Sequence, residues 1–477
     1  MTLVAVAAIS LAAYALTFVE LDLGWVLDNG LDTLARGIPR TNDESFLEPG
    51  HPVVMHSWAA NVLFAVAQLE LGGAGIAWMH GLLVLLVAVC CGASCWQRAP
   101  GPLPAATAAL FGMLLVPYAF LYVRAQLFSC AFLPVVVAVV MSRSPRGYLG
   151  LMPLLALWAN VHGGFVLGLA LALGGLGIEA SRAALGRESR LSVRGCLALA
   201  TGLVAATLLN PWGPAVYGQA SSSSLGGHTG LLTEWYPAWH PAVLKAAGWQ
   251  YLALTLAAAA ASWRLRHRPE ALLTAAAVTV LAYSAVRHAR LAPLALAPLI
   301  AETLAPLTRR VSTRGGGLVV GAVGAVGLMG IVARADQLGS LHTPAGVAPA
   351  TVLAMLAPVP EGTRVWNDFD IGGALVFSCP QCRLAIDGRA IAAYSGAHLV
   401  DMLQPADSVL ARRIEASGVP IVITLERALV EGLRGYRRVM CDGYCLLVRD
   451  EDPVVLAPPP ESIPFDRLFQ GRGRPFP

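Results

Sequence analysis

The chain has 477 residues, of which 56% are hydrophobic and only 13% are charged, and its formal net charge is +4. Soluble globular chains carry roughly 25% charged residues, so the composition excludes an ordinary soluble protein. The small net charge also argues against nucleic acid as a partner. Arginine greatly outnumbers lysine, and alanine, glycine and proline are abundant, which is typical of coding bias in high-GC bacteria.

Repeated apolar runs of nearly 20 residues predict a polytopic, mainly α membrane protein. The first run, 2–19, has no basic segment before it and no convincing cleavage site, so we expect a retained helix rather than a signal peptide. A helix near 57–70 is expected to lie at the membrane interface. About eleven spans are predicted from the apolar runs, near 2–19, 73–95, 102–123, 127–142, 147–161, 163–181, 195–212, 248–263, 270–286, 291–306 and 317–334.

Arginines sort the loops between these spans into two kinds. Those at 98, 143–146, 182–194, 264–268 and 309–314 all fall on one side, whereas the other side carries most of the acids. Loops rich in arginine stay in the cytoplasm. We therefore expect a bacterial inner-membrane protein whose first loop (20–56) and whose chain after Arg334 are extracytoplasmic.

The composition changes from about 340. Short apolar runs such as "TRVWND" and "VPIVITL", separated by Gly, Pro and Asp, predict strands, and "ADSVLARRIEASG" has helical spacing. We expect a helical membrane domain over 1–335, an extracytoplasmic α/β domain over 340–455 and a proline-rich tail over 456–477.

Polar side chains gather near the outer ends of the predicted spans, where ionisable and amide groups are candidates for function. They lie in "YVRAQLFS", "LLALWANVHGGFVLG", "LLNPWGPAVY", "LLTEWYPAWHP" and "AYSAVRHARLAP". The simpler interpretation makes the aromatic residues interfacial anchors, His162 a structural histidine, and Arg287 and Arg290 contacts to lipid phosphate. The acids of the first loop, beginning with Glu20 and Asp22, are then merely solvated. The occurrence of all of them on one side favours a shared site.

The loop stretches "DLGWVLDNG", "GIPRTND" and "HPVVMHSWAANVLF" resemble the first outer loop of bacterial GT-C-type membrane glycosyltransferases. Large members of that superfamily also have counterparts of "RAQLFS", "LWANVHGGF", "NPWG", "EW" and "DGRAIAAY", so the resemblance covers nearly the whole chain. The superfamily usually has proline in place of Ala125 and glutamate in place of Ser57. Members such as protein O-mannosyltransferases and lipid A aminoarabinose transferases use a polyprenyl-phosphate sugar. The resemblance therefore implies a lipid-linked-sugar transferase of the cell envelope, whose donor tail lies among helices and membrane lipids.

In such a transferase an acceptor hydroxyl attacks the sugar while negative charge grows on the leaving phosphate. Guanidinium groups suit the phosphate because they are always charged and bind it in bidentate fashion, and a carboxylate is needed to take the hydroxyl proton. We expect Asp22 to be this base, with Asp43 and Glu234 as alternatives. The expected donor-phosphate residues are Arg124, Arg287, Arg290 and His162, and the expected substrate-binding residues are Glu20, Trp58, Asn160, Trp235, Asp387, Arg389 and Tyr394. A divalent metal is compatible with these acids, but no ligand spacing demands one.

Four cysteines lie in the C-terminal domain, in "CPQC" (Cys379 and Cys382) and "CDGYC" (Cys441 and Cys445). An even number in an oxidising compartment favours disulfides, with a zinc site or free thiols as alternatives. A two-residue turn at Asp442–Gly443 would leave Cys441 and Cys445 on opposite faces, so their pairing with each other is not expected.

Other classes of protein remain open. A transporter or flippase of lipid-linked glycans would use the same basic and aromatic cavity, although such proteins usually contain internal repeats and none is visible here. A membrane scaffold that presents the C-terminal domain needs no base at all. A thiol oxidoreductase would depend on "CPQC" alone.

Overall fold

The computed structural model describes residues 22–101, 122–219, 229–308 and 350–459. The predicted first span, 2–19, the span near 317–334 and most of that near 102–123 lie outside these residues, as does Glu20. The chain forms two compact units. The helical unit contains the described residues 80–101, 122–219 and 232–308, and the sheet unit contains 22–79, 229–231 and 350–459.

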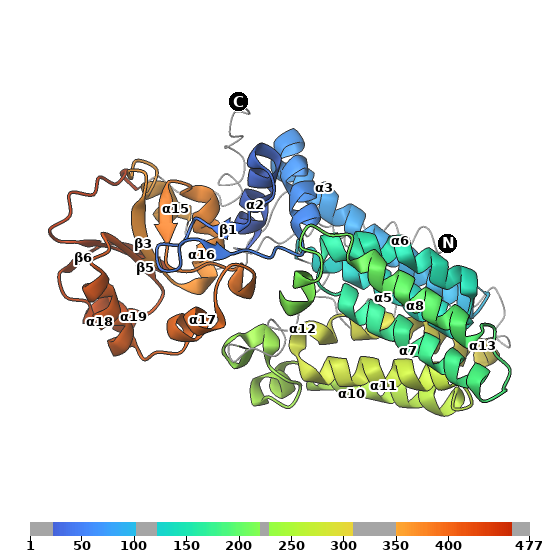
Figure 1. Ribbon diagram of the computed structural model, residues 1–477. Helices are drawn as coiled ribbons and strands as arrows, with labels where there is room; N and C mark the ends of the chain where they lie inside the picture. Colours follow the sequence, from blue (N-terminus) through green and yellow to red (C-terminus); the bar gives the residue numbers. More distant parts are fainter. Residues whose placement is uncertain (1–21, 102–121, 220–228, 309–349, 460–477) are drawn as a thin grey trace. The chain divides into compact units, whose positions relative to one another are not determined.

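The helical unit contains bundled helices, several of which are joined by short loops (Figure 1). Prolines begin α6, α10 and α11, where the missing N–H costs nothing. Ser144 and Ser192 cap α6 and α8 by accepting hydrogen bonds from the backbone N–H groups of Gly147 and Gly195. The elements of this unit are the later part of α3 (Trp58–Arg98), α5 (Gln126–Ser142), α6 (Pro145–Val161), α7 (Phe165–Ala184), α8 (Val193–Thr207), η3 (Thr233–Trp235), α10 (Pro241–Arg264), α11 (Pro269–Ser284), α12 (Val286–Ala289) and α13 (Ala292–Thr308).

Helix α5 lies at the centre of this unit. Of its 17 residues, 14 are buried, because it packs against α6, α7, α11 and α13 on different sides. A helix that is apolar all round needs such surroundings. By contrast α10 exposes large apolar side chains, with Trp249 62%, Leu256 61% and Trp263 73% exposed. Water would solvate such a surface poorly.

The predicted spans agree with helices wherever the chain is described, with bounds that differ by a few residues at most ends. The predicted interfacial helix and the span near 73–95 are both contained in α3, which has non-helical backbone at Gly72. Within the described residues, α3 and α7 are the two helices long and apolar enough to cross a membrane by length and composition. The number of eleven spans therefore stays a prediction.

Arginines at one end of the helical unit are paired with three glutamates, of which Glu179 and Glu270 are buried. Glu179 contacts Arg143 and Arg182, and Glu270 contacts Arg182. A second group joins Glu302 to Arg98 at 2.7 Å and to Arg268; together the two groups tie α3, α5, α7, α11 and α13 to one another. These arginines therefore hold helix ends together, a role that their sequence pattern did not indicate.

The sheet unit is built on five strands in the order β4–β3–β5–β7–β6. The strands β4, β3 and β5 are parallel, and β7 and β6 continue the sheet in antiparallel fashion. The α/β character expected for the C-terminal region is present. The elements are α15 (Ala350–Met355), β3 (Thr363–Asn367), α16 (Phe369–Ser378), β4 (Cys382–Leu384), η5 (Ala390–Ala392), α17 (Gly396–Leu403), α18 (Asp407–Ser417), β5 (Ile421–Thr424), α19 (Arg427–Gly432), β6 (Tyr436–Asp442) and β7 (Tyr444–Arg449).

The first loop packs into the same unit as the sheet. It forms α2 (Leu23–Arg36) and the short strands β1 (Thr41–Asn42) and β2 (His51–Pro52), and then leads into α3. The sheet unit also includes the early part of α3 and η2 (Thr229–Leu231). Beyond β4, the backbone N–H of Phe46 donates to the carbonyl of Leu384 and the N–H of Leu384 donates to Glu44, at 3.1 and 2.7 Å. The loop thus covers the β4 edge of the sheet, which would otherwise present unpaired backbone groups.

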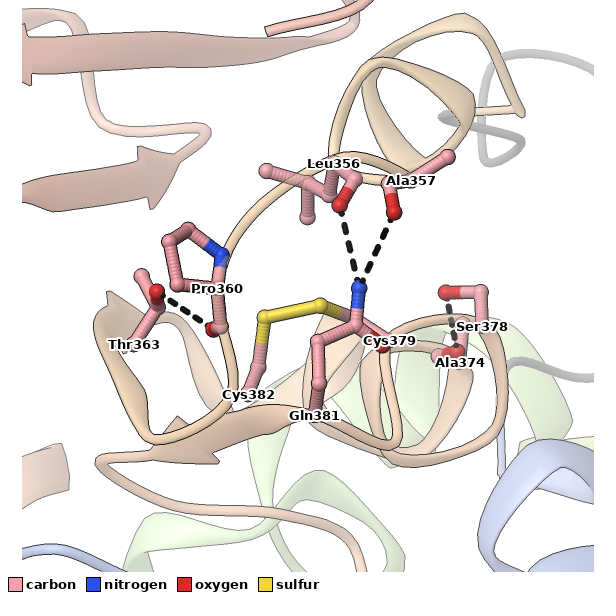
Figure 2. The surroundings of a disulfide bond; sticks show 9 residues. All are labelled: Leu356, Ala357, Pro360, Thr363, Ala374, Ser378, Cys379, Gln381 and Cys382. Carbon is pink, nitrogen blue, oxygen red and sulfur yellow. Dashed lines mark hydrogen bonds between the residues drawn. A yellow bond between two sulfur atoms is a disulfide. The ribbon is translucent and has the colours of Figure 1, made fainter. Parts of the chain in front are cut away.

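Disulfides join the four cysteines in two local pairs. Cys379 bonds Cys382 between α16 and β4, and Gln381 in the same turn donates to the carbonyl of Leu356 at 3.2 Å (Figure 2). Cys441 bonds Cys445, a pairing that the two-residue turn expected from the sequence disfavoured. The reason is the register: Gly443 alone turns the β6–β7 hairpin, so Cys441 and Cys445 are cross-strand partners on one face.

Candidate functional site

Two arginines from distant parts of the helical unit converge on one carboxylate. Arg124 precedes α5, Glu234 lies in η3, and Arg287 lies in α12. The Nη1 of Arg287 is 2.9 Å from Oε1 of Glu234, and the Nη1 of Arg124 is 3.4 Å from Oε2 of the same residue. All three side chains are about 30% exposed, at 29, 31 and 29%. We call these three residues the Arg–Glu–Arg cluster.

Neighbouring side chains hold Arg287 in place. Its guanidinium carbon lies 4.5 Å from the ring centre of Trp235, in cation–π geometry. The indole is contacted edge-on by His288, with ring centres 5.6 Å apart. From the start of α5, Gln126 donates to the backbone carbonyl of Arg287 at 2.9 Å. Two segments far apart in the sequence therefore hold Arg287, Trp235 by its guanidinium and Gln126 by its backbone.

The charges of the cluster shift the pKa values of Glu234 and of the neighbouring His288. Burial raises the pKa of Glu234, but the charges of Arg287, Arg124 and Arg290 outweigh it, so the pKa lies below its usual value. Burial and the charge of Arg287 lower the pKa of His288 to about 4. At neutral pH the ionised Glu234 therefore has a neutral His288 nearby, and the positive charge of the cluster comes from its arginines.

His162 lies at the break between α6 and α7, and two neighbouring groups contact its Nδ1. The N–H of Gly164 donates to its Nδ1 at 3.0 Å, and Ser129 Oγ lies 2.6 Å from the same atom. Trp158 Nε1 donates to Ser129 Oγ at 2.8 Å. Because Nδ1 accepts from Gly164, the proton of the neutral ring is on Nε2.

Asn160, expected to bind substrate, joins two helices. Its Nδ2 donates to the carbonyls of Ala156 and Leu209 at 2.7 and 2.8 Å. These bonds connect the end of α6 to the residues that follow α8.

A buried ion network in the sheet unit contains Asp387, Arg389 and Tyr394. Arg389 donates to both carboxylate oxygens of Asp387, at 2.9 and 2.6 Å, and Tyr394 donates to Asp387 Oδ2 at 2.7 Å. Arg389 also reaches the first loop, where it donates to Glu44 Oε2 at 2.8 Å and to Asn42 Oδ1 at 3.0 Å. The network therefore fastens the first loop to the sheet.

Burial and charge shift the pKa values of Asp387 and Tyr394 in opposite directions. Burial raises the pKa of Asp387, but Arg389 and the Tyr394 hydroxyl outweigh it and hold the pKa below its usual value. Burial, with the nearby Asp387, raises the pKa of Tyr394 well above its usual value. Asp387 and Tyr394 are fully buried and hydrogen-bonded to each other. They therefore stabilise the position of the first loop rather than forming an open binding surface.

Asp22 directly precedes α2 and lies beside Gly388 within the sheet unit. A Cβ added to Gly388 would lie 1.9 Å from Asp22 Oδ1 and 2.9 Å from Trp25 Nε1. Asp43 is exposed and accepts a hydrogen bond from Thr41 at 3.1 Å. Trp58 is half-buried at the start of α3.

Asp28, Asp32 and Glu44 offer carboxylate oxygens within 4.8 Å of one another. Such a group could hold a divalent cation. Two of the three already contact arginines, since Arg36 Nη2 is 2.5 Å from Asp32 and Arg389 Nη1 is 2.8 Å from Glu44. The cluster therefore does not by itself demand a metal.

The sequence-predicted residues fall into both units. Arg124, Glu234 and Arg287 come together in the helical unit, and Arg290 acts on Glu234 through its charge. Asp387, Arg389 and Tyr394 come together in the sheet unit, where Asp22 also lies. Sequence reasoning missed the roles of Asn42, Glu44 and Gly388, because a contact across 345 residues leaves no local signal.

Comparison with known proteins gives a match only at the level of structure. No family model and no curated protein matches the chain. ArnT from Cupriavidus metallidurans bound to undecaprenyl phosphate has a TM-score of 0.54 at 14% identity, over 95% of this chain and 98% of that chain. The Archaeoglobus fulgidus oligosaccharyltransferase in the apo form has a TM-score of 0.56 at 10% identity, over 89% of this chain and 69% of that chain. The archaeal oligosaccharyltransferase AglB from Archaeoglobus fulgidus, in complex with an inhibitory peptide and a dolichol-phosphate, has a TM-score of 0.55 at 11% identity, over 88% of this chain and 69% of that chain.

The chain has the GT-C fold of membrane glycosyltransferases, and the resemblance expected from its sequence is confirmed at the level of the fold. It is similar to ArnT over nearly the full length of both chains. Because these identities are low, the likeness concerns the fold, and the activity is a separate question.

Proposed function

We propose that this protein is a membrane glycosyltransferase that moves a sugar from a polyprenyl-phosphate donor to an acceptor hydroxyl. The observation that carries the proposal is the Arg–Glu–Arg cluster within a GT-C fold. Two guanidinium groups and one carboxylate leave an excess of positive charge, which suits a phosphate. A structural neighbour, ArnT, is bound to undecaprenyl phosphate.

In this proposal Arg124 and Arg287 bind the donor phosphate, with Arg290 adding positive charge. As the sugar leaves, charge grows on the phosphate, and guanidinium groups fixed in advance stabilise that charge without reorganising. Trp235 and Gln126 supply the fixing, because they hold the side chain and the backbone of Arg287. His162 is the further residue that we propose for binding the donor phosphate.

Asp22 is the proposed base that takes the proton of the acceptor hydroxyl. Glu234 suits this role less, because two arginines occupy its oxygens and lower its pKa. Asp43 is the remaining alternative in the first loop. Asp22 differs from Asp43 because it packs closely beside Gly388 in the sheet unit, which fixes the position of its carboxylate.

We further propose that the helical unit spans the bacterial inner membrane with the Arg–Glu–Arg cluster at its extracytoplasmic side. Arg124 and Arg143 flank opposite ends of α5, whose 17 residues span about 25 Å. This length approaches the roughly 30 Å of a bilayer core. Positive-inside counting places the Arg143 end in the cytoplasm, and the exposed apolar side chains of α10 fit a lipid environment.

The test combines a deletion strain with complementation. Mass spectrometry of envelope glycans, glycoproteins and polyprenyl-phosphate sugars should show the loss of one sugar from its acceptor and accumulation of the matching donor. Wild-type protein should restore the sugar, whereas Asp22→Asn and Arg287→Gln should not. Arg413→Gln, at an arginine of the sheet unit whose side chain is 40% exposed, should restore it fully.

Two results would contradict the proposal. An unchanged glycome would favour the scaffold interpretation. Restoration by Asp22→Asn, with the donor altered only in the leaflet it occupies, would favour a transporter or flippase, which needs no base.

A further inference from the structure

Glu234 occupies the guanidinium groups to which the donor phosphate would bind. Its two oxygens face separate arginines, Oε1 facing Arg287 at 2.9 Å and Oε2 facing Arg124 at 3.4 Å. The phosphodiester of a polyprenyl-phosphate sugar carries one negative charge and two non-bridging oxygens, so it needs N–H donors just as a carboxylate does. Both anions cannot use the same N–H groups at once.

We propose that Glu234 is an internal counter-ion of the phosphate site, which keeps the two arginines together while the site is empty and is displaced by the donor phosphate. This inference rests on the proposed function, since it assigns the regulation of the same site. It makes Glu234 a positioning residue and removes it from the candidates for the base.

The contacts of the cluster suit an exchange. The 3.4 Å contact to Arg124 is longer than the roughly 2.8 Å usual for a charge-assisted hydrogen bond, so this half of the bridge is weakly held. The Glu234 side chain is 31% exposed, which leaves it room to turn towards solvent.

Arg287 does not depend on Glu234 alone for its position. Arg287 stacks on Trp235, and Gln126 holds its backbone carbonyl. The segment that carries Glu234 is itself anchored, because the N–H of Val286 donates to the carbonyl of Tyr236 and the N–H of Ala238 donates to that of Tyr283, both at 3.0 Å. Displacement therefore requires rotation of one side chain rather than movement of the backbone.

The consequence is competition. The carboxylate raises the concentration of phosphate needed to fill the site, and it disfavours weaker anions that cannot replace it. Removing its charge should therefore tighten the binding of phosphate compounds, whereas removing a carboxylate that merely supports the arginines would loosen it.

Glu302 provides a matched control. It also bridges two arginines of the helical unit, Arg98 and Arg268, and its side chain is 20% exposed. Glu302→Gln changes the net charge by the same amount as Glu234→Gln but leaves the proposed phosphate site intact. An effect of overall charge would appear in both variants.

The experiment measures dissociation constants of the purified full-length protein in detergent, for farnesyl phosphate and for inorganic phosphate. Glu234→Gln should lower the dissociation constant about tenfold for both probes, since the competition concerns the phosphate group itself, and Glu302→Gln should leave it within about twofold of wild type. Glu234→Asp, whose shorter side chain reaches less far, should give an intermediate value and serves if the glutamine variant does not fold.

The outcomes separate the inference from the proposed function. Unchanged or weaker binding by Glu234→Gln, with farnesyl phosphate still sensitive to Arg287→Gln, would overturn the counter-ion role alone. A gain for farnesyl phosphate without one for inorganic phosphate would also overturn it. Binding of farnesyl phosphate that is insensitive to Arg124→Gln and Arg287→Gln, or absent in every variant, would overturn both the donor site and the inference.

Discussion

Gly388 lies so close to Asp22 that a methyl carbon at position 388 would fall 1.9 Å from the Oδ1 of Asp22. No real Cβ tolerates that distance, so an alanine there must displace the carboxylate or the backbone around it. Helix α2, which begins directly after Asp22, makes a second close approach. A Cβ at Gly24 in α2 would fall 2.1 Å from the carbonyl oxygen of Gly373 in α16. The position of Asp22, the proposed base, thus depends on glycines of the sheet unit.

Gly388→Ala is therefore expected to reduce turnover at least tenfold while leaving the affinity for the donor phosphate unchanged. A misplacement of about 1 Å can cost a hundredfold in rate. Gly432→Ala is the control, because a Cβ at that position of the same unit meets nothing within 4 Å. Equal turnover of the two variants, with both proteins folded, would show that Asp22 does not need its present position.

Asp22→Asn should retain donor binding and lose turnover by a factor of about 10² to 10⁴, the usual contribution of a general base. Single-turnover transfer and farnesyl phosphate binding, measured on the same preparation, separate these effects. If Asp43→Asn rather than Asp22→Asn abolishes transfer, the base is Asp43.

Arg389→Ala should destabilise the protein by about 3–5 kcal/mol, because it leaves the buried carboxylate of Asp387 without its partner. Thermal unfolding in detergent measures this loss. Arg413→Ala serves as the comparison, since its pair with Asp401 is exposed and 3.6 Å long, and such pairs contribute about 0–1 kcal/mol. Similar melting temperatures for both variants would contradict a structural role of the Arg389 network.

Asp368 should make the sheet unit less stable as the pH rises from about 4 to about 6. Burial, with the charges of Glu426 and Asp370, raises its pKa from 3.8 to about 6, although bonds from Leu425 and Thr424 oppose the shift. The folded protein then binds this proton more tightly than the unfolded chain, so the free energy of unfolding falls as the proton leaves.

Asp368→Asn should remove that part of the pH dependence and raise the melting temperature at pH 7 relative to wild type. An asparagine oxygen can still accept the hydrogen bond that the Leu425 N–H donates to Asp368, at 2.7 Å. Asp450→Asn, at an exposed carboxylate of the same unit, is the control. An unaltered pH profile in Asp368→Asn would assign the effect to another group.

Alkylation without a reductant should leave Cys379, Cys382, Cys441 and Cys445 unmodified in protein from an oxidising compartment, because each is bonded to a neighbour. Peptide mass spectrometry should show the 379–382 and 441–445 pairs, and reduction should expose all four thiols. Zinc release accompanied by alkylation of these residues would instead support the zinc alternative.

Some features of this protein are determined by sequence alone. Apolar runs mark α5, α6, α7, α8, α11 and α13, because a helix buried among helices must be apolar over most of its length. The change in composition near residue 340 marks the α/β region, and "RAQLFS", "EW" and "AVRHAR" already contained the members of the Arg–Glu–Arg cluster. Periodicity and composition are local properties, so they can be read without knowing the fold.

Only the tertiary structure decided which of these residues meet. Nothing in the sequence pairs Glu234 with Arg124, 110 residues away, or Arg389 with Glu44, 345 residues away. Nor could it distinguish a hairpin turn at Gly443 alone from one at Asp442–Gly443, and that single residue of register decides whether Cys441 and Cys445 share a face. Such contacts follow from the packing of whole elements, whose energies are summed over many residues, and no local pattern contains that sum.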